Sequence, residues 1–352
     1  MSPNPANAYA AINARTRGMY STLLTQQDLL VLSEAKDFDA LIGFLKNTAY
    51  GPYFERLKDK ELTPRRAAYL ANSRLSEAFH SIISNVPEHA RELITQMYRY
   101  HEVSNLKGVL RGIVTGSTWD KVRFVLFPLG CECVLPAQEM LESGNVAQAV
   151  ELLRGTQYYD VLSYAVKRYN AEQNLFPIEV ALDLAYWRVL WKTVDALPKG
   201  DRPYAARVIG TLLDTNNLMW AIRYRAYHNL SEEEIINYTL PFGYHVKDED
   251  IRAIAAGAEI APIVKKLFPS LHGVDEMLSN MHSGLPKLEV QLERMVAAQC
   301  HSCFMGDPFQ IGIPVGFLQL FSFEIQELIV LFEAKSRKQK GEEFKEFLLM
   351  EV

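Results

Sequence analysis

The sequence predicts an all-α protein made of three similar helical domains. Apolar residues recur at helical spacing in the long segments, and sustained two-residue alternation bounded by turn dipeptides is missing. A ten-residue helical signature also returns near the end of each third of the 352-residue chain. A repeat this long indicates a small domain rather than a solenoid unit of about 20–50 residues. We therefore place the domain limits at 1–125, 126–236 and 237–352.

The signature consists of an acid, an amide three residues later, a leucine next to the amide, and an arginine further along the helix. Its first three members lie on one helical face. The acid recurs after 112 residues and again after 110. The copies are Glu102, Asn105, Leu106 and Arg111; Asp214, Asn217, Leu218 and Arg223; and a decayed third copy, Glu324, Glu327 and Leu328.

Further markers accompany the first two copies in the same order. Each copy is followed by Ser-x-x-acid, which resembles a capping box at a helix start, and then by Pro-x-Gly, which is expected to stop that helix. Each copy is preceded by a leucine, a threonine and a tyrosine, and these two sets lie 108 residues apart. The markers are Leu45, Thr48, Tyr50, Ser117, Asp120, Pro128 and Gly130 in the first copy, and Leu153, Thr156, Tyr158, Ser231, Glu234, Pro241 and Gly243 in the second.

Caps and prolines set the expected helix limits. Thr63 is a natural N-cap with Pro64 at the first helical position, so a helix is predicted over 63–83, and Pro87 ends it. The Ser-Gly-Leu-Pro segment at 283–286 is predicted as a break between helices. The other long helices are expected over 89–114, 178–197, 205–228, 287–298 and 315–343.

The composition is that of an ordinary soluble globular protein, with 49% apolar and 22% charged residues. The net charge of −5 argues against a nucleic-acid binder, which would carry a basic stripe. The N-terminal segment shows no apolar signal-peptide core, and no segment reaches the roughly 20 apolar residues of a membrane span. The nearest, Pro308 to Phe323, contains two prolines and two glycines and is predicted as a buried loop followed by a helix. We expect a soluble chain that meets a membrane through a partner.

Sequence motifs for catalysis or metal binding are missing. The chain contains no phosphate-binding loop, no dinucleotide fingerprint, no H-E-x-x-H and no G-x-S-x-G. Its four cysteines form two close pairs, Cys131/Cys133 and Cys300/Cys303, whereas a zinc site usually needs four ligands from two such pairs. We predict reduced, buried thiols, no cofactor and no metal.

The recurring asparagines are predicted to be structural. Asn105 and Asn217 are poor residues for a helix interior, so their recurrence implies a compensating polar contact. A buried or interfacial hydrogen-bond network that locks each helix hairpin is the favoured interpretation. Direct contact with a partner or catalysis is the alternative, and catalysis would require the same chemistry in three copies.

These features together resemble one protein family over nearly the whole chain. The carriers of the resemblance are the opening Tyr9–Met19, the element Asp37–Tyr50, the Asn-Leu-x-x-x-x-Arg helices, the Ser-x-x-acid starts, and the closing Pro308–Leu318 and Glu324–Leu328. The family is that of the C subunit of archaeal and bacterial V/A-type rotary ATPases, whose equivalent in the eukaryotic vacuolar proton pump is the d subunit. Glu327, where the family pattern suggests asparagine, and Glu333, at the place of the signature arginine, depart from that pattern.

The resemblance implies three helical domains around a pseudo-threefold axis, forming a funnel. One end would sit on the cytoplasmic face of the membrane-embedded proteolipid ring, and the socket would receive the foot of the central shaft, subunits D and F. The protein would turn with the rotor and pass torque between ATP chemistry and proton or sodium transport. It would have no active site of its own.

Two other hypotheses stay open from the residues alone. One is a helical scaffold or adaptor unrelated to rotary motors, and the other is an enzyme that uses the Cys300/Cys303 pair. For the rotor hypothesis, arginines are the candidates for polar contacts with the shaft or ring. These are Arg15, Arg17, Arg111, Arg223 and Arg225.

Overall fold

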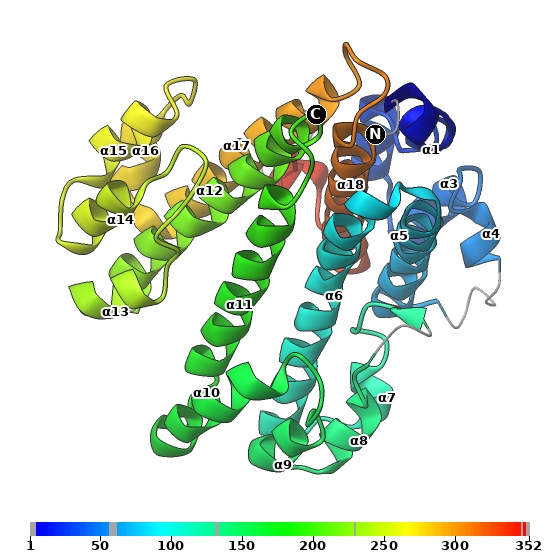
Figure 1. Ribbon diagram of the computed structural model, residues 1–352. Coiled ribbons are helices and arrows are strands. Elements are labelled where there is room, and N and C mark those ends of the chain that lie inside the picture. Colours follow the sequence, from blue (N-terminus) through cyan, green and yellow to red (C-terminus); the bar gives the residue numbers. More distant parts are fainter. Residues whose placement is uncertain (1–4, 56–61, 131–133, 229, 346–347, 350–352) are drawn as a thin grey trace. The chain divides into compact units, whose positions relative to one another are not determined.

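The computed structural model describes residues 5–55, 62–130, 134–228, 230–345 and 348–349. Within these ranges the regular structure is entirely helical, so the all-α prediction is confirmed (Figure 1). A short 3₁₀ helix at Gly341–Glu343 comes after the last α-helix. The helices are α1 (Pro5–Tyr20), α2 (Gln26–Glu34), α3 (Phe38–Leu45), α4 (Gly51–Phe54), α5 (Pro64–Asn85), α6 (Glu88–Val114), α7 (Trp119–Val122), α8 (Ala137–Glu142), α9 (Val146–Glu151), α10 (Tyr159–Glu172), α11 (Phe176–Asp195), α12 (Arg202–Tyr227), α13 (Glu232–Asn237), α14 (Asp248–Ala255), α15 (Ile260–Leu267), α16 (Val274–Ser279), α17 (Met281–Ser302) and α18 (Gly312–Ser336).

The chain divides into two compact units. Unit 1 combines residues 1–41, 85–90 and 194–352, and unit 2 combines residues 42–84 and 91–193. Unit 1 therefore holds the second and third copies of the signature, and unit 2 holds the first. Each unit draws on segments far apart in the sequence, so its core depends on contacts that no single stretch of chain can make.

Unit 2 is built on the long helices α5, α6 and α11. The α5 helix begins as predicted, because the Thr63 hydroxyl accepts the Arg66 N–H at 3.4 Å and Pro64 needs no intrahelical partner. Its apolar side chains, from Ala67 to Ile83, are buried along one stripe. The short helices α8, α9 and α10 pack on one another, near one end of α6 and α11 (Figure 1).

The two leucine–threonine–tyrosine markers form the same turn twice within unit 2. The Thr48 hydroxyl donates to the Leu45 carbonyl at 2.7 Å and accepts the Tyr50 N–H at 3.2 Å. The Thr156 hydroxyl repeats both bonds, to Leu153 at 2.7 Å and from Tyr158 at 3.3 Å. In each copy the threonine thus satisfies backbone groups that the ending helix leaves open.

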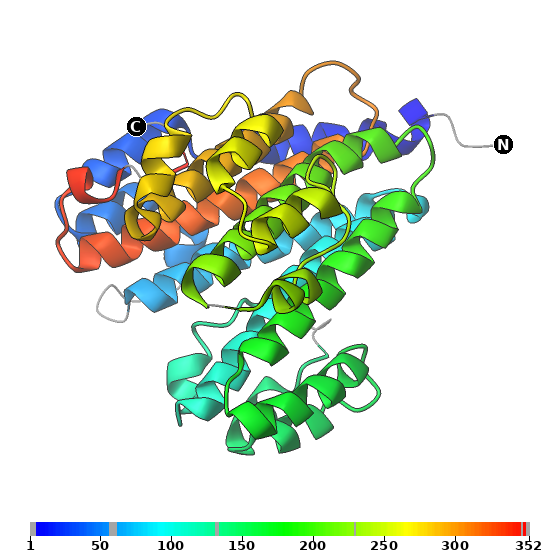
Figure 2. The same cartoon turned by 90° about the vertical axis from the view of Figure 1, so that its left-hand side faces the viewer.

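Unit 1 centres on α12, α17 and α18, which pack on one another, with α1 against α18. The short helices α14 and α16 contact α12 and α17 respectively, and both views place this yellow group beside the long helices (Figures 1 and 2). Close approach requires glycine at Gly284, because a Cβ there would lie 1.7 Å from the carbonyl oxygen of Met277.

Three local expectations were wrong. Residues 283–286 do not separate two helices but lie inside α17. Asn280 caps the start of this helix by accepting the Ser283 N–H. Pro286 therefore stands in the second turn of a helix, a position that costs one backbone hydrogen bond. The last helix begins at Gly312 and ends at Ser336, because Lys338 takes a left-handed backbone with φ of 58°.

The third error concerns the Ser-x-x-acid starts. Ser231 and Glu234 form a full capping box at the start of α13, as predicted. In the first copy Thr118 is the N-cap of α7 and makes no side-chain capping bond, while the Ser117 hydroxyl lies 2.9 Å from that of Thr115. Both helices also end before their Pro-x-Gly, which lies in the following loop.

The α18 helix corrects the expectation that no segment has the length and apolar content of a membrane span. Its 25 residues are enough to cross a membrane by length and composition. However, 72% of its most apolar window is buried inside the protein, as expected for a core helix. The interpretation of Pro308 to Phe323 as a buried loop followed by a helix is confirmed for the helix, which starts at Gly312. In the loop, Gln310 and Ile311 are buried, whereas Pro308 and Phe309 are exposed.

Candidate functional site

Each signature asparagine attaches a loop to its helix through two hydrogen bonds to one residue. In unit 2 the Asn105 amide donates to the Phe127 carbonyl at 2.8 Å and accepts the Phe127 N–H at 2.7 Å. In unit 1 Asn217 makes the same two bonds to Leu240, both at 2.8 Å. The bonded residue immediately precedes the proline of Pro-x-Gly in both copies. A side-chain amide can satisfy both backbone groups of a residue in this way, which explains its use inside a helix.

The signature acids hold the next part of the same loops. Asp214 accepts the Tyr244 N–H at 2.8 Å and the His245 N–H at 2.6 Å. Glu102 accepts the Val134 N–H at 3.1 Å and the hydroxyl of Tyr158. Burial raises the pKa of Asp214 to about 6, although the N–H donors of the loop oppose this shift. The signature is therefore a loop anchor that repeats in the two units.

The signature arginines connect helices rather than loops. Arg111 on α6 binds Glu179 on α11 with two bonds of 2.6 and 2.9 Å. Arg223 on α12 binds Glu289 on α17 at 2.5 Å. The partner glutamates lie 68 and 66 residues further along the chain, so this contact belongs to the repeat as well. Lys107 and Asp183 form a second link between α6 and α11 at 2.6 Å.

We expect Lys107→Met to lower the free energy of unfolding by about 2 kcal/mol at neutral pH, because it leaves the half-buried Asp183 carboxylate without its cation. Methionine is a fair test, since Met219 occupies the equivalent place in the second copy. Burial raises the pKa of Asp183, so the loss should shrink as the pH falls and that group takes up a proton. Urea unfolding at several pH values measures this.

Arg111→Ala is the matched control for this experiment. Arg111 belongs to the same pair of helices, but its side chain is 62% exposed. Exposed ion pairs contribute about 0–1 kcal/mol, so we expect a small change that salt reduces. Equal losses for the two variants would contradict a special role for the buried pair.

The third copy keeps the acid and the leucine but changes the amide and the arginine. Glu324 on α18 is buried and accepts the Leu24 N–H at 2.5 Å. Glu327 replaces the asparagine and is also buried. Glu333 replaces the arginine and pairs within its own helix, with Arg337 at 3.4 Å. The loop-anchoring role of the acid is thus retained, while the arginine-to-glutamate link is not.

The five candidate contact arginines differ in what they already bind. Arg17 donates to the Phe304 carbonyl at 3.0 Å, and Arg225 donates to three carbonyls at the end of α14, including Gly257 at 3.1 Å. Arg111 and Arg223 are in the ion pairs described above. Arg15 is exposed on α1. Their contact with a partner stays a prediction.

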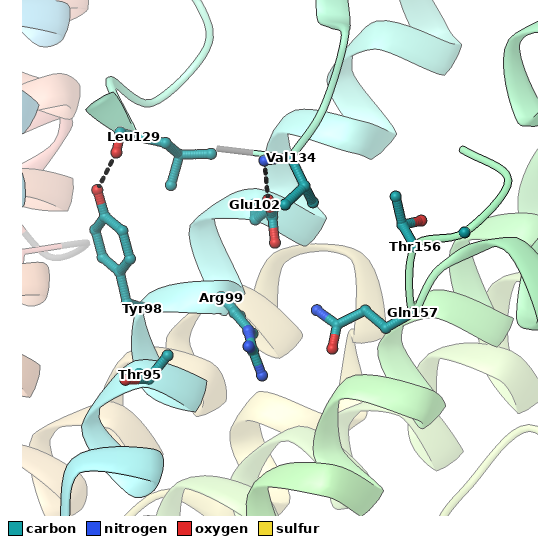
Figure 3. Close-up of a pocket in the computed structure, with 9 residues that line it drawn as sticks. Thr95, Tyr98, Arg99, Glu102, Leu129, Val134, Thr156 and Gln157 are labelled. Carbon is teal, nitrogen blue, oxygen red and sulfur yellow. Dashed lines mark hydrogen bonds between the residues drawn. The ribbon is translucent and has the colours of Figure 1, made fainter. Parts of the chain in front are cut away.

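A pocket of about 390 Å³ lies beside the first signature in unit 2. Glu102 and Arg99 reach it from α6, and Gln157 points from its turn toward Arg99 (Figure 3). Arg99 also lies 3.3 Å from Glu92 and from Gln96. The Glu102 carboxylate already accepts two bonds, so within this pocket it serves the loop anchor.

The cysteine prediction is tested in part. Cys131 and Cys133 lie outside the described residues. Cys300 and Cys303 are free and buried, and burial raises the pKa of both thiols, which disfavours the reactive thiolate. Among the residues that the structure describes, no group of three or more His, Cys, Asp or Glu side chains is arranged to hold a metal ion.

Comparison with known proteins identifies the family of this chain. A family model described as ATP synthase (C/AC39) subunit matches residues 12–347. This chain belongs to that family. The predicted resemblance to the C subunit of V/A-type rotary ATPases is therefore confirmed, and it extends over nearly the whole C/AC39 chain.

Several archaeal relatives of this C/AC39 protein are named as the C subunit of an A-type ATP synthase. That of Methanocaldococcus jannaschii is 24% identical over 347 residues, covering 97% of this chain and 86% of the relative. That of Methanothermobacter thermautotrophicus is 24% identical over 349 residues, with 98% and 87% covered. That of Pyrococcus abyssi is 22% identical over 344 residues, with 97% and 90% covered.

Some features of the two units have only a weak signal in the sequence. The Lys107–Asp183 pair is one, and a groove between α17 and α18 is another. The pair could have been found from its spacing, because Lys107 and Asp183 each lie four residues from a member of the Arg111–Glu179 pair. The groove depends on how two helices pack, which no local pattern reports.

Proposed function

We propose that this protein is a non-catalytic central-stalk component of a V/A-type ATPase. It couples the shaft subunits D and F to the membrane proteolipid ring and transmits torque in ATP-linked proton or sodium transport. It is a peripheral component on the cytoplasmic face of the membrane and reaches the membrane through the ring. The observation that carries this proposal is the family match over residues 12–347.

The loop anchors support a mechanical role. A coupler must resist deformation, because a body that shears under load dissipates torque instead of passing it on. Asn105 and Asn217 each hold a loop with two buried bonds, and close-packed helical interiors transmit strain well. We also propose that three helical domains, 1–125, 126–236 and 237–352, are arranged around a pseudo-threefold axis and together form a funnel.

The polar side chains of the signature are engaged in structural contacts, which favours a protein without an active site of its own. The signature acids and amides are bound to backbone groups, and the signature arginines to glutamates. Cys300 and Cys303 are buried thiols rather than exposed nucleophiles. Chemistry in the complex then belongs to other subunits, and this chain supplies stiffness and binding surfaces.

We expect a tagged copy to retain the proteolipid, the shaft subunits and the ATPase catalytic subunits when it is purified from gently solubilised native membranes. Mass spectrometry of the eluate identifies these proteins, and the same tag on an unrelated soluble protein is the control. Recovery of soluble partners without proteolipid would reject the coupler and favour a helical scaffold.

A further inference from the structure

The pocket of about 390 Å³ in unit 2 contains a guanidinium that the protein uses on one side only. Among the residues that the structure describes, the Arg99 side chain makes two polar contacts, from Nη1 to Glu92 and to Gln96, both at 3.3 Å. Its Nε and Nη2 atoms therefore carry three N–H donors without a protein acceptor. Arg111 on the same helix shows what this edge can bind, since its Nε and Nη2 hold the two oxygens of Glu179 at 2.6 and 2.9 Å.

Two further polar side chains line the same pocket. Thr95 lies one helical turn before Arg99, and its hydroxyl makes no hydrogen bond to the described residues. Gln157 comes from the turn before α10, and its amide is directed toward Arg99 (Figure 3). Burial raises the pKa of Tyr158, and Gln157 opposes this rise, as a donor close to a negative charge does. The pocket therefore gathers hydrogen-bond donors from two separate segments of unit 2.

The carboxylate of Glu102 limits the charge that a ligand of this pocket can carry. Glu102 is 5% exposed, and its oxygens accept the Val134 N–H at 3.1 Å and the hydroxyl of Tyr158 instead of pairing with Arg99. Its negative charge opposes a ligand with several negative charges of its own. Leu129 and Val134 give the pocket an apolar side (Figure 3). The chemistry suits a monoanion with a small apolar body.

We propose that this pocket binds a small organic monocarboxylate, with both oxygens on Nε and Nη2 of Arg99 and its apolar part against Leu129 and Val134. Thr95 and Gln157 supply further donors. The volume lies within the range of about 300–1,000 Å³ that small-molecule sites occupy. Inorganic phosphate is disfavoured, because its second negative charge would lie near the buried signature acid. A bound carboxylate joins α6 to the turn before α10 and so stabilises the folded chain.

The test uses the full chain, purified alone, with sodium benzoate as the probe. Benzoate is a planar monocarboxylate with an apolar ring, and benzamide has nearly the same shape without the charge. We expect benzoate to raise the midpoint of thermal unfolding and to give a saturable signal in ligand-detected nuclear magnetic resonance, whereas benzamide at the same concentration gives neither. Inorganic phosphate, titrated at the same ionic strength, is expected to bind more weakly than benzoate.

Three variants assign the binding to the guanidinium. Arg99→Gln is expected to weaken benzoate binding at least tenfold, since the charge-assisted pair is lost. Arg111→Gln is the matched control, because it removes the same charge from the same helix outside the pocket, and its affinity should not change. Glu92→Gln should tighten binding severalfold, because this 64% exposed carboxylate competes for the same guanidinium.

The proposal would be overturned by equal signals for benzoate and benzamide, by tighter binding of phosphate, or by equal affinities of the Arg99→Gln and Arg111→Gln variants. Thermal unfolding without ligand shows whether each variant folds. If Arg99→Gln does not fold, Glu92→Gln decides, and an unchanged affinity in that variant rejects the site. All titrations use the isolated chain, so their outcome is independent of whether it couples a shaft to a ring.

Discussion

Asn217→Leu is expected to lower the free energy of unfolding by about 3–5 kcal/mol, because two buried backbone groups lose their partner at once. The Asn217 side chain is fully buried, and its amide both donates to and accepts from Leu240 at 2.8 Å. Leucine fits the volume but can satisfy neither group. Each unsatisfied group costs about 1–3 kcal/mol. The other signature residue that holds the α13–α14 loop, Asp214, binds it further along, at Tyr244 and His245.

Asn216→Leu is the matched control for this variant. Asn216 is the preceding residue of α12, is half-buried, and donates only within its own helix, to the Leu212 carbonyl at 2.8 Å. Its replacement should change stability by less than about 1 kcal/mol. Urea unfolding gives the free energies, and hydrogen exchange of the Leu240 amide reports the loop directly. Slow exchange at Leu240 in Asn217→Leu would refute the anchoring role.

Asn105→Leu should produce the same defect in unit 2, at the Phe127 amide. Its side chain makes the two equivalent bonds, at 2.8 and 2.7 Å, and is 6% exposed. Parallel losses in two units would show that the signature acts by one mechanism in both copies.

The helices and the importance of the asparagines could be predicted from the sequence, because both leave local patterns. Helical spacing is written in the apolar residues, and Thr63 with Pro64 marks the start of α5. An amide that recurs inside a helix is unfavourable locally, so its recurrence implied a polar contact elsewhere. The contact residues themselves, Phe127 and Leu240, were not predicted, although each immediately precedes a noted proline.

The wrong expectations have physical causes in tertiary packing. Gly284 and Pro286 are helix breakers by propensity, but α17 continues through them because Asn280 caps its start and Gly284 packs against Met277. The end of α18 depends on the left-handed Lys338, a conformation that lysine seldom adopts. The groove between α17 and α18 could not be predicted from the sequence, because it depends on how the two helices pack together.

Glu293→Gln is expected to stabilise the isolated chain by about 1–3 kcal/mol at pH 8 and to change little at pH 4. Burial raises the pKa of Glu293 to about 7, and the carboxylates of Glu289 and Glu327 add to this shift while Arg223 opposes it. Its ordinary value is 4.5, so the folded chain holds this proton more tightly than the unfolded chain. The corresponding stability is present below pH 4.5 and is lost as the pH rises through about 7.

Thermal or urea unfolding across this range measures the difference, and Glu289→Gln is the control. Glu289 lies one helical turn away, but its charge is paired with Arg223 at 2.5 Å, so its removal should bring no gain at pH 8. An equal gain for Glu293→Gln at both pH values would point to packing rather than charge.

A comparison of the two copies explains why the Glu293 carboxylate is destabilising. Asp183, the equivalent of Glu293, has Lys107 beside it, whereas the second copy has Met219 in the place of that lysine. The first copy thus offsets its buried carboxylate with a lysine at this position, and the second copy does not.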